Sequence, residues 1–211
     1  MKKIVLGTAL MAVIASTAAA KFEGAYVKGD LVYSATSLTF KDKTNNTNYK
    51  DTKLNGFGGV ATVGYGDNSG SVYLGGEAYL GKVFADKKVA SGTKTTKATA
   101  GWNAGVAGRV GGHINNTTLA YFRLGLDYAR YEVKYENSAA TTNNFKKNFA
   151  VWSMVPGVGI DAKVSHNVFL TAGVDYAIPF KADVPSSAKS KVGYSKKPHS
   201  MTFRVGVGYE F

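Results

Sequence analysis

Ten charged side chains stand singly among glycines and apolar residues, and they are the residues of this sequence that could do chemistry together. Because their neighbours along the chain offer few opposite charges, each acid or base needs a partner from another segment. Gathered by a fold, they would neutralise one another in ion pairs or line a narrow path for ions. The ten are Lys28, Asp30, Glu77, Arg109, Arg123, Asp127, Asp161, Asp175, Arg204 and Glu210.

The sequence offers little for catalysis or for a bound cofactor. His113 and His166 lie in separate short polar stretches, and His199 stands alone near the closing segment. No Ser-His-Asp cluster and no convergent pair of acids can be read from these positions. The segment 56–61 fits the G-x-G-x-x-A nucleotide pattern, but the helix that this pattern requires does not follow it. We therefore expect no enzyme, no cofactor and no metal site.

Alternation of apolar with small or polar residues is the main pattern of the chain. In the closing segment 201–211, every odd-numbered residue is apolar or aromatic, and every even-numbered residue is small, polar or charged. Such a period of two predicts a β-strand. Each repeat approaches the roughly 9 to 11 residues with which a tilted strand crosses a bilayer. The pattern recurs in 25–33, 57–65, 72–80, 98–109, 120–128, 150–161, 168–178 and 201–211.

Two positions within these segments need a specific prediction. In 98–109, Ala98, Ala100 and Trp102 fall on the apolar parity and are expected on the outward face. Pro156 lies inside 150–161 and has no N–H to give to a neighbouring strand, so we expect a β-bulge there. The alternative is a slip of one residue in that strand near Pro156.

The connections between the segments alternate in length. Short turns are expected at 66–70, 111–117 and 165–167, and long polar connections at 34–53, 84–96, 136–148 and 181–197. A transmembrane barrel has this alternation, with short turns in the periplasm and long loops outside. The sequence therefore predicts an all-β fold, an eight-stranded antiparallel transmembrane up-and-down β-barrel, with both termini in the periplasm.

The apolar face is expected to meet lipid, although a soluble barrel with an apolar interior would alternate in the same way. Soluble exteriors are usually rich in Lys and Glu, and the polar faces here carry lone charges between glycines. Aromatic residues also sort by depth, as they do at both boundaries of a membrane. Near the loop end lie Tyr33, Phe57, Trp102, Tyr128, Trp152, Tyr176 and Phe203, and near the turn end Tyr65, Tyr209 and Phe211.

The first twenty residues resemble an export signal. Lys2 and Lys3 precede an apolar stretch, and the segment 18–20 is Ala-Ala-Ala, which suits cleavage. The apolar stretch is shorter than the roughly 20 residues of a membrane-spanning helix. We expect a signal peptide at 1–20 and one barrel domain at 21–211. The sequence contains no cysteine, so stability must come from packing or from the bilayer rather than from disulfides.

With these features the chain resembles the small outer-membrane barrels that include opacity-type surface proteins and relatives of the transmembrane part of outer-membrane protein A. The resemblance rests on the opening segment 24–29 and on the alternating end that closes with Tyr209-Glu210-Phe211. It implies that the barrel-assembly machinery reads the aromatic end as an assembly signal. On this chain that signal would comprise Phe203, Val205, Val207, Tyr209 and Phe211.

Eight strands enclose only enough space for side chains, so the ten charges are expected to pair and plug the barrel. The predicted function is an integral outer-membrane protein with a structural role in the envelope and with exposed loops, without catalysis. Two alternatives remain open at this point, a small porin-like channel through the charged interior and a surface adhesin.

The net charge of the chain is concentrated in the long connections. The formal charge of the whole sequence is +12, and removal of Lys2 and Lys3 would leave +10. The four long connections contribute surpluses of two, two, one and four basic residues, which is nine of these ten. Solvation alone could explain them, or they could attract polyanions such as lipopolysaccharide or host-surface glycans. The best candidates are Lys189, Lys191, Lys196 and Lys197; nucleic acid is not an expected partner.

Overall fold

The computed structural model describes residues 22–38, 40–41, 52–91, 94–137, 145–183, 193–194 and 199–211. The alternating segments form long strands there, because the period of two gives each strand one apolar and one polar face. The wall of the molecule consists of β1 Gly24–Leu38, β3 Thr52–Ser69, β4 Val72–Phe84, β5 Asp86–Ser91, β6 Lys94–Asn115, β7 Thr118–Asn137, β8 Phe145–Lys163, β9 Val168–Asp183 and β11 His199–Glu210. Two short strands, β2 Phe40–Lys41 and β10 Gly193–Tyr194, pair separately.

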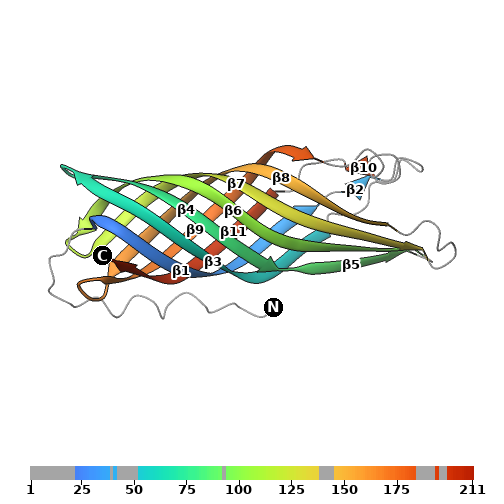
Figure 1. Cartoon of the computed structure of the whole chain (residues 1–211), viewed down its shortest axis with the longest axis horizontal. Coiled ribbons are helices and arrows are strands. Elements are labelled where there is room, and N and C mark those ends of the chain that lie inside the picture. The colour runs from blue at the N-terminus through green and yellow to red at the C-terminus, as the bar shows by residue number, and fades with distance from the viewer. Residues whose placement is uncertain are drawn as a thin grey trace, which may run out of the picture.

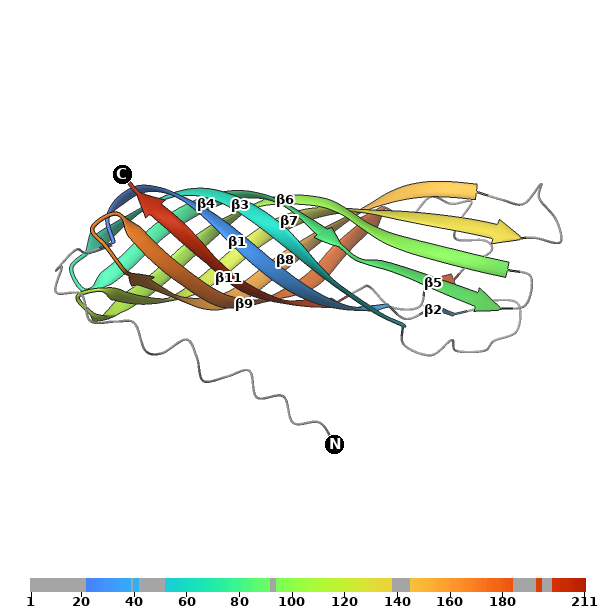
Figure 2. The same cartoon turned by 90° about the horizontal axis from the view of Figure 1, so that it is seen from below.

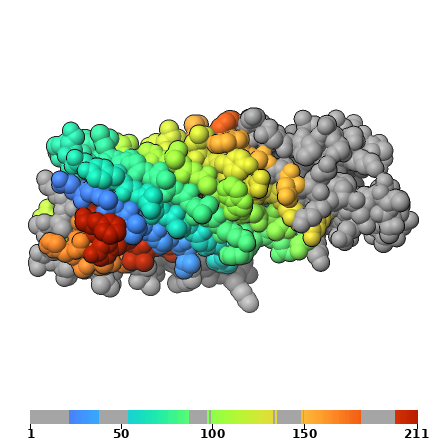
Figure 3. All heavy atoms as spheres, viewed as in Figure 1, coloured from blue at the N-terminus to red at the C-terminus, as the bar shows by residue number. Residues whose placement is uncertain are grey.

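The strands close into an antiparallel barrel. Each wall strand pairs with the next along the chain, and β1 pairs with β11, where Leu31 lies opposite Val205. β4 and β5 form one wall strand interrupted at Ala85, because both pair with β6. The predicted eight-stranded up-and-down barrel is therefore confirmed. Figure 3 shows the closure directly, since atoms of β1 in blue lie beside atoms of β11 in red.

The two ends of the barrel differ in their connections. Short turns join β3 to β4, β6 to β7 and β8 to β9 at the end where β11 finishes, as Figure 1 shows. β5 and the small pair of β2 and β10 lie at the opposite end, which Figure 2 shows from a second side. Gly70 has a φ of 65° in the first turn, a conformation that glycine adopts without strain. Among the described residues, no helix is both long and apolar enough to cross a membrane.

The strands continue further than the sequence analysis predicted. The segment 84–96 was expected to be a long loop, and this prediction is wrong. β5 and the start of β6 form a hairpin there, with Val89 paired to Thr96. β1 and β3 likewise extend into the expected connection 34–53, as far as the pair Leu38 and Thr52. Polar and β-branched residues on both arms allow the backbone ladder to continue beyond the apolar band.

The predicted alternation is visible as exposure. On β1 and β3, outward Leu31 and Phe57 are 73% and 71% exposed, whereas inward Val32 is 2% exposed. Ala100 departs from the prediction, because it packs inward against Leu54 and Ala85. A register shift between Ala100 and Asn103 accounts for the inward facing of Ala100. In addition, the N–H of Ala100 donates to the carbonyl oxygen of Ala85 at 2.9 Å, which ties this bulge to the break between β4 and β5.

The bulge expected at Pro156 is displaced. The register between β8 and β9 shifts between Trp152 and Ser153, where β9 carries one extra residue, Phe180. At Pro156 the register is the same on both sides, and Pro156 itself pairs with Leu124 of β7. The ladder towards β9 is interrupted there, between the pairs of Met154 and Gly157. A missing N–H therefore removes pairing on one side of Pro156 without changing which residues face inward.

Candidate functional site

The interior of the barrel holds the polar side chains that the sequence singled out. All ten predicted charges are buried, and the structure adds an eleventh, Lys163 of β8. The set contains five bases and six acids, so its formal charges nearly cancel. Within the described residues every wall strand except β3 and the β5 extension supplies at least one of these charges. The interior is therefore crossed by a charged layer rather than lined along one wall.

Glu77 of β4 is the centre of this layer. Its Oε1 accepts a hydrogen bond from Lys28 Nζ at 2.6 Å and from the Tyr26 hydroxyl at 3.0 Å. Arg109 Nη1 lies 3.3 Å from the same oxygen, and Arg123 Nε donates to Oε2 at 2.8 Å. One carboxylate thus joins strands β1, β6 and β7 across the barrel, and three cations depend on it.

Arg109 of β6 extends the layer to the opposite wall. Its guanidinium pairs with Asp161 of β8 and donates to the Tyr26 hydroxyl at 2.9 Å. The guanidinium carbon lies 3.6 Å from the centre of the Tyr121 ring and 5.5 Å from the centre of the Tyr73 ring. A cation stacked on an aromatic face is stabilised most where water is excluded. Arg109 is therefore held by charge and by three buried tyrosines together.

A second group of charges lies beside the first. Asp175 of β9 forms an ion pair with Arg204 of β11, with 2.8 Å between Oδ2 and Nε, and its Oδ1 accepts a hydrogen bond from Nη2 at 3.2 Å. Arg123 Nη1 lies 3.5 Å from the same carboxylate and connects this group to Glu77. Asp30 is the loosest member, with its Oδ2 3.8 Å from Arg204. Asp127 accepts a hydrogen bond from Asn103 Nδ2 at 3.0 Å.

The turn end of the barrel is filled by aromatic side chains. Lys163 of β8 pairs with Glu210 of β11 at 2.8 Å, and its Nζ lies 5.1 Å from the centre of the Phe22 ring. Phe22 packs edge-on against Phe169 with a centroid distance of 5.6 Å. These buried rings and the ion pairs behind them fill the interior at the turn end.

Glycines in the wall make room for these rings. A Cβ on Gly64 would overlap the Tyr26 ring, and one on Gly159 would overlap the Tyr121 ring. Glycine at such positions allows a bulky side chain to lie against the opposite backbone. The pairing of aromatic residues with glycines on neighbouring strands therefore determines how tightly the interior closes.

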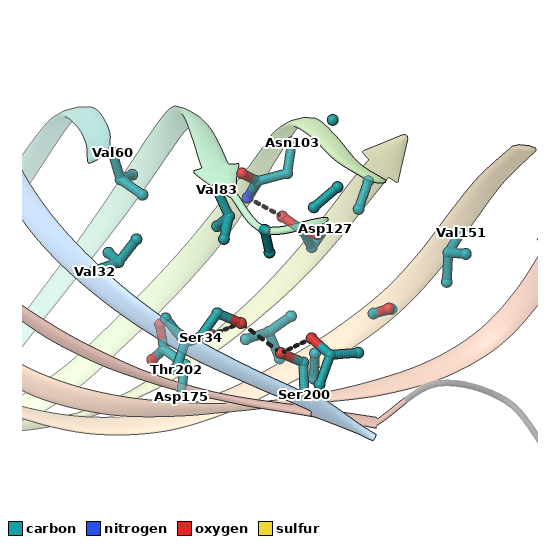
Figure 4. A pocket seen from close by; sticks show the side chains of 18 of the residues that line it. Val32, Ser34, Val60, Val83, Asn103, Asp127, Val151, Asp175, Ser200 and Thr202 are labelled. Carbon is teal, nitrogen blue, oxygen red and sulfur yellow. Dashed lines mark hydrogen bonds between the residues drawn. The ribbon is translucent and has the colours of Figure 1, made fainter. Parts of the chain in front are cut away.

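The half of the barrel away from the turn end contains a cavity of about 120 Å³. Figure 4 shows valines projecting into it, among them Val32, Val60, Val83 and Val151. Its inner boundary includes Arg123, Asp127, Asp175 and Arg204. Along one wall, Ser34 Oγ and Ser200 Oγ are 2.8 Å apart, and Thr202 Oγ1 donates to Ser34 at 3.2 Å. Members of the charged layer therefore form part of the cavity wall.

Other predicted residues lie away from the interior. Phe203, Val205, Val207, Tyr209 and Phe211 are all on the outward face of the closing strand or just beyond it, between 44% and 72% exposed. Lys189, Lys191, Lys196 and Lys197 lie outside the described residues. His113 packs on Phe22, and its Nε2 lies 2.8 Å from Asn68 Oδ1, so it belongs to the filled turn end. Within the described residues, no cluster of His, Cys, Asp and Glu has the arrangement of a metal site.

Lys163 and Asn103 were missed from the sequence. The signal for Lys163 was available, because the inward parity of β8 continues from Asp161 by two residues. Asn103 lies beside the register shift of β6, and its role as donor to Asp127 could be read only after the neighbouring strand was placed.

Comparison with known proteins agrees with this architecture. The sequence model of a family described as outer membrane protein beta-barrel domain matches residues 5–211. Among solved structures, the Neisserial surface protein A is 15% identical, with 89% of this chain and 97% of that chain covered and a TM-score of 0.52. OprG of Pseudomonas aeruginosa is 13% identical, with 92% and 98% covered and a TM-score of 0.51. No curated protein sequence matches. At these identities the structural likeness shows the fold alone.

Proposed function

This chain belongs to the outer membrane protein β-barrel domain family, and on that premise we propose that it is a sealed membrane anchor that displays its long connections at the cell surface. The observation that carries the proposal is the charged layer. Lys28, Glu77, Arg109 and Asp161 form a continuous chain of contacts from β1 through β4 and β6 to β8. An ion would have to displace buried, mutually neutralised charges in order to pass.

Further features of the proposal follow from the barrel family and the sequence. The segment 1–20 acts as a signal peptide, the short turns face the periplasm, and the long connections face outward. Outer-membrane lipids surround the apolar face. The aromatic end of β11 directs assembly by the barrel-assembly machinery. The proposal includes no catalytic role, since the interior charges are bound to one another rather than directed to a common open point.

Conductance across a planar bilayer tests the sealed interior. Wild-type protein is expected to insert without discrete current steps at neutral pH. Glu77→Gln should produce irregular currents, because Lys28, Arg109 and Arg123 lose the carboxylate that they share and water enters to solvate them. Asp86→Asn is the matched control, because Asp86 pairs with Lys97 on the exposed hairpin. Regular, reproducible steps from the wild-type protein would instead support a porin-like channel.

Polyanion binding by the long connections is a second candidate function. It is favoured by the surplus of nine basic residues in the four segments 34–53, 84–96, 136–148 and 181–197, which includes Lys189, Lys191, Lys196 and Lys197. Changing these four lysines to glutamine should reduce capture on immobilised heparin or lipopolysaccharide while the barrel still folds. Such contacts are screened over about 8 Å at physiological salt, so binding should also weaken as salt rises. Equal capture by the quadruple variant would leave solvation as the role of these lysines.

A further inference from the structure

Two basic residues interrupt the apolar outer face of the barrel among the side chains that the structure describes. Lys82 of β4 follows Leu80 and precedes Phe84 on the outward parity, and both of those neighbours are strongly exposed. Arg130 of β7 occupies the outward parity that Leu126 and Tyr128 define, and it is exposed as well. Charges on the lipid face are costly near the middle of a membrane and are tolerated at its boundaries. The depth of Lys82 and Arg130 in the membrane therefore decides whether their charges are tolerated there.

Both bases lie near the loop end of the wall. Lys82 stands ten residues after Val72, which begins the outward face of β4, and Arg130 stands ten after Ala120 of β7. Ten residues rise about 34 Å along a strand, or about 26 Å at a tilt of about 40°. The apolar band of outer-membrane barrels is about 25 Å tall. Lys82 and Arg130 thus lie where hydrocarbon gives way to head groups, at the end of the long connections.

Trp102 brings the two bases into one row. Lys82 is paired with Trp102 of β6 in the register of the two strands. The guanidinium carbon of Arg130 lies 5.5 Å from the centre of the Trp102 ring. Trp102 lies in the register shift between Ala100 and Asn103, and it is 40% exposed. β4, β6 and β7 are neighbours in the wall, so the row crosses three adjacent strands.

Neither base has an acidic partner among the residues that the structure describes. Two bases further along the same end do, since Lys97 pairs with Asp86 at 3.3 Å and Lys134 with Glu132 at 3.7 Å. Lys82 Nζ instead lies 5.3 Å from the centre of the Phe84 ring. Two cations that have no acidic partner and lie beside aromatic rings at a membrane boundary attract an anion. Guanidinium and ammonium groups both bind phosphate well.

The surface beside Lys82, across β3 and β1, suits an acyl chain. A groove lined by Gly29, Leu31, Gly59, Ala61 and Leu80 has Lys82 and Trp102 at one end. A Cβ on Gly29 would meet nothing within 4 Å, and one on Gly59 would approach only the backbone oxygen of Asp30, at 3.9 Å. The groove is therefore open to the membrane and bare of side chains at these positions. An apolar groove beside two cations suits an amphipathic anion, whose acyl chain would occupy the groove and whose charged group would contact the cations.

We propose that Lys82, Trp102 and Arg130 form a binding site for the phosphate groups of lipid A, the glycolipid of the outer leaflet, with an acyl chain in the adjacent groove. The proposal rests on the orientation given under the proposed function, which places the long connections outside. The site differs from the basic residues of the long connections. It would bind the phosphate of a membrane lipid at the outer face of the barrel wall, whereas those residues would bind a polyanion beyond the membrane.

Native mass spectrometry of the detergent-solubilised barrel with added lipid tests the site. Bisphosphorylated lipid A should bind the wild-type protein at least tenfold more tightly than the Lys82→Gln/Arg130→Gln variant. Lipid A without phosphates should bind both proteins equally and weakly. Lys97→Gln/Lys134→Gln removes the same formal charge at the same end and should retain wild-type affinity. Heat-modifiable gel mobility of each variant confirms that its barrel is folded.

Three results would overturn the site. Equal losses in the two double variants would show that general charge, and not this row, attracts the lipid. If the wild-type protein bound dephosphorylated lipid A as tightly as bisphosphorylated lipid A, the site would not recognise phosphate. If it bound phosphatidylglycerol equally tightly, the site would not be specific for the phosphates of lipid A. Protease access to the long connections on intact cells reports the orientation independently, so an inverted barrel and a missing lipid site give different results.

Discussion

At the scale of single residues, the interior depends on partners that lie far apart in the sequence. Glu77 accepts contacts from Lys28, Arg109 and Arg123, and removing one member of such a buried group leaves the others uncompensated. The positions of the ten charges on the inward parity could be predicted from the sequence. Their pairing could not, because it depends on how far each strand is staggered against its neighbours. The bond from Asn103 to Asp127 illustrates this limit.

Glycine next to an interior ring gives a residue-scale prediction. Gly64→Ala should destabilise the barrel by about 1 to 3 kcal/mol, as overpacking usually does, because the added methyl group would overlap the Tyr26 ring. Tyr26 cannot retreat freely, since its hydroxyl bonds to Glu77 and Arg109. Urea unfolding in lipid vesicles measures the change in the free energy of unfolding.

Gly76→Ala is the matched control for that measurement. Gly76 is an outward residue of β4, and a Cβ there would meet nothing within 4 Å. The substitution should change the free energy of unfolding by less than about 0.5 kcal/mol. Equal effects at Gly64 and Gly76 would show that Tyr26 does not pack against β3 as described.

At the scale of strands, alternation predicted the faces well and the irregularities poorly. The inward and outward residues of 72–80 and 201–211 agree with the predicted parity. Ala100 and the register shift beside Trp152 differ from the prediction. A bulge depends on how two neighbouring strands pair, and the alternation within one strand does not show this. The hairpin of β5 and β6 was missed for a related reason. Its pairing continues beyond the apolar band that made the other strands recognisable.

Depth along one strand gives a prediction at this scale. Val205→Lys on β11 should cost roughly 2 to 4 kcal/mol, because Val205 lies on the outward face near the middle of the apolar band. Met201→Lys, on the same face but ten residues from Phe211, should cost only about 0 to 1 kcal/mol. Folding into lipid vesicles measures both. A harmless lysine at Val205 would contradict the assignment of this face to lipid.

The end of β11 carries a prediction about assembly. Deleting Phe211 should lower the amount of folded protein in the outer membrane, if the outward aromatic end is the assembly signal that the family resemblance implies. Phe211 packs edge-on against Tyr209 with a centroid distance of 5.2 Å, on the outer face. Replacement by Tyr should retain assembly, whereas Ser should not. Surface labelling compares the strains, and undiminished levels after deletion would remove this role.

At the scale of the whole molecule, the distribution of polarity is the reverse of that in a soluble domain. Bases and acids occupy the interior, and large apolar side chains such as Leu31, Phe57 and Phe84 face outward. Burying so many charges is favourable only because they neutralise one another, and exposing so many apolar groups is favourable only in lipid. Closure of the wall is what makes both possible, since an open sheet would leave unpaired backbone groups in the membrane.

The closing pair of strands therefore tests the central claim most directly. The natural sequence has no cysteine, so Leu31→Cys and Val205→Cys can be introduced together without competing thiols. These residues lie opposite each other on β1 and β11, within the range that a disulfide can bridge. Oxidation of the folded protein should join them and shift the mobility of the denatured chain on a gel, whereas Leu31→Cys with Tyr209→Cys should stay reduced. A disulfide in the variant with Leu31→Cys and Tyr209→Cys, or no disulfide in either variant, would contradict the closed barrel in this register.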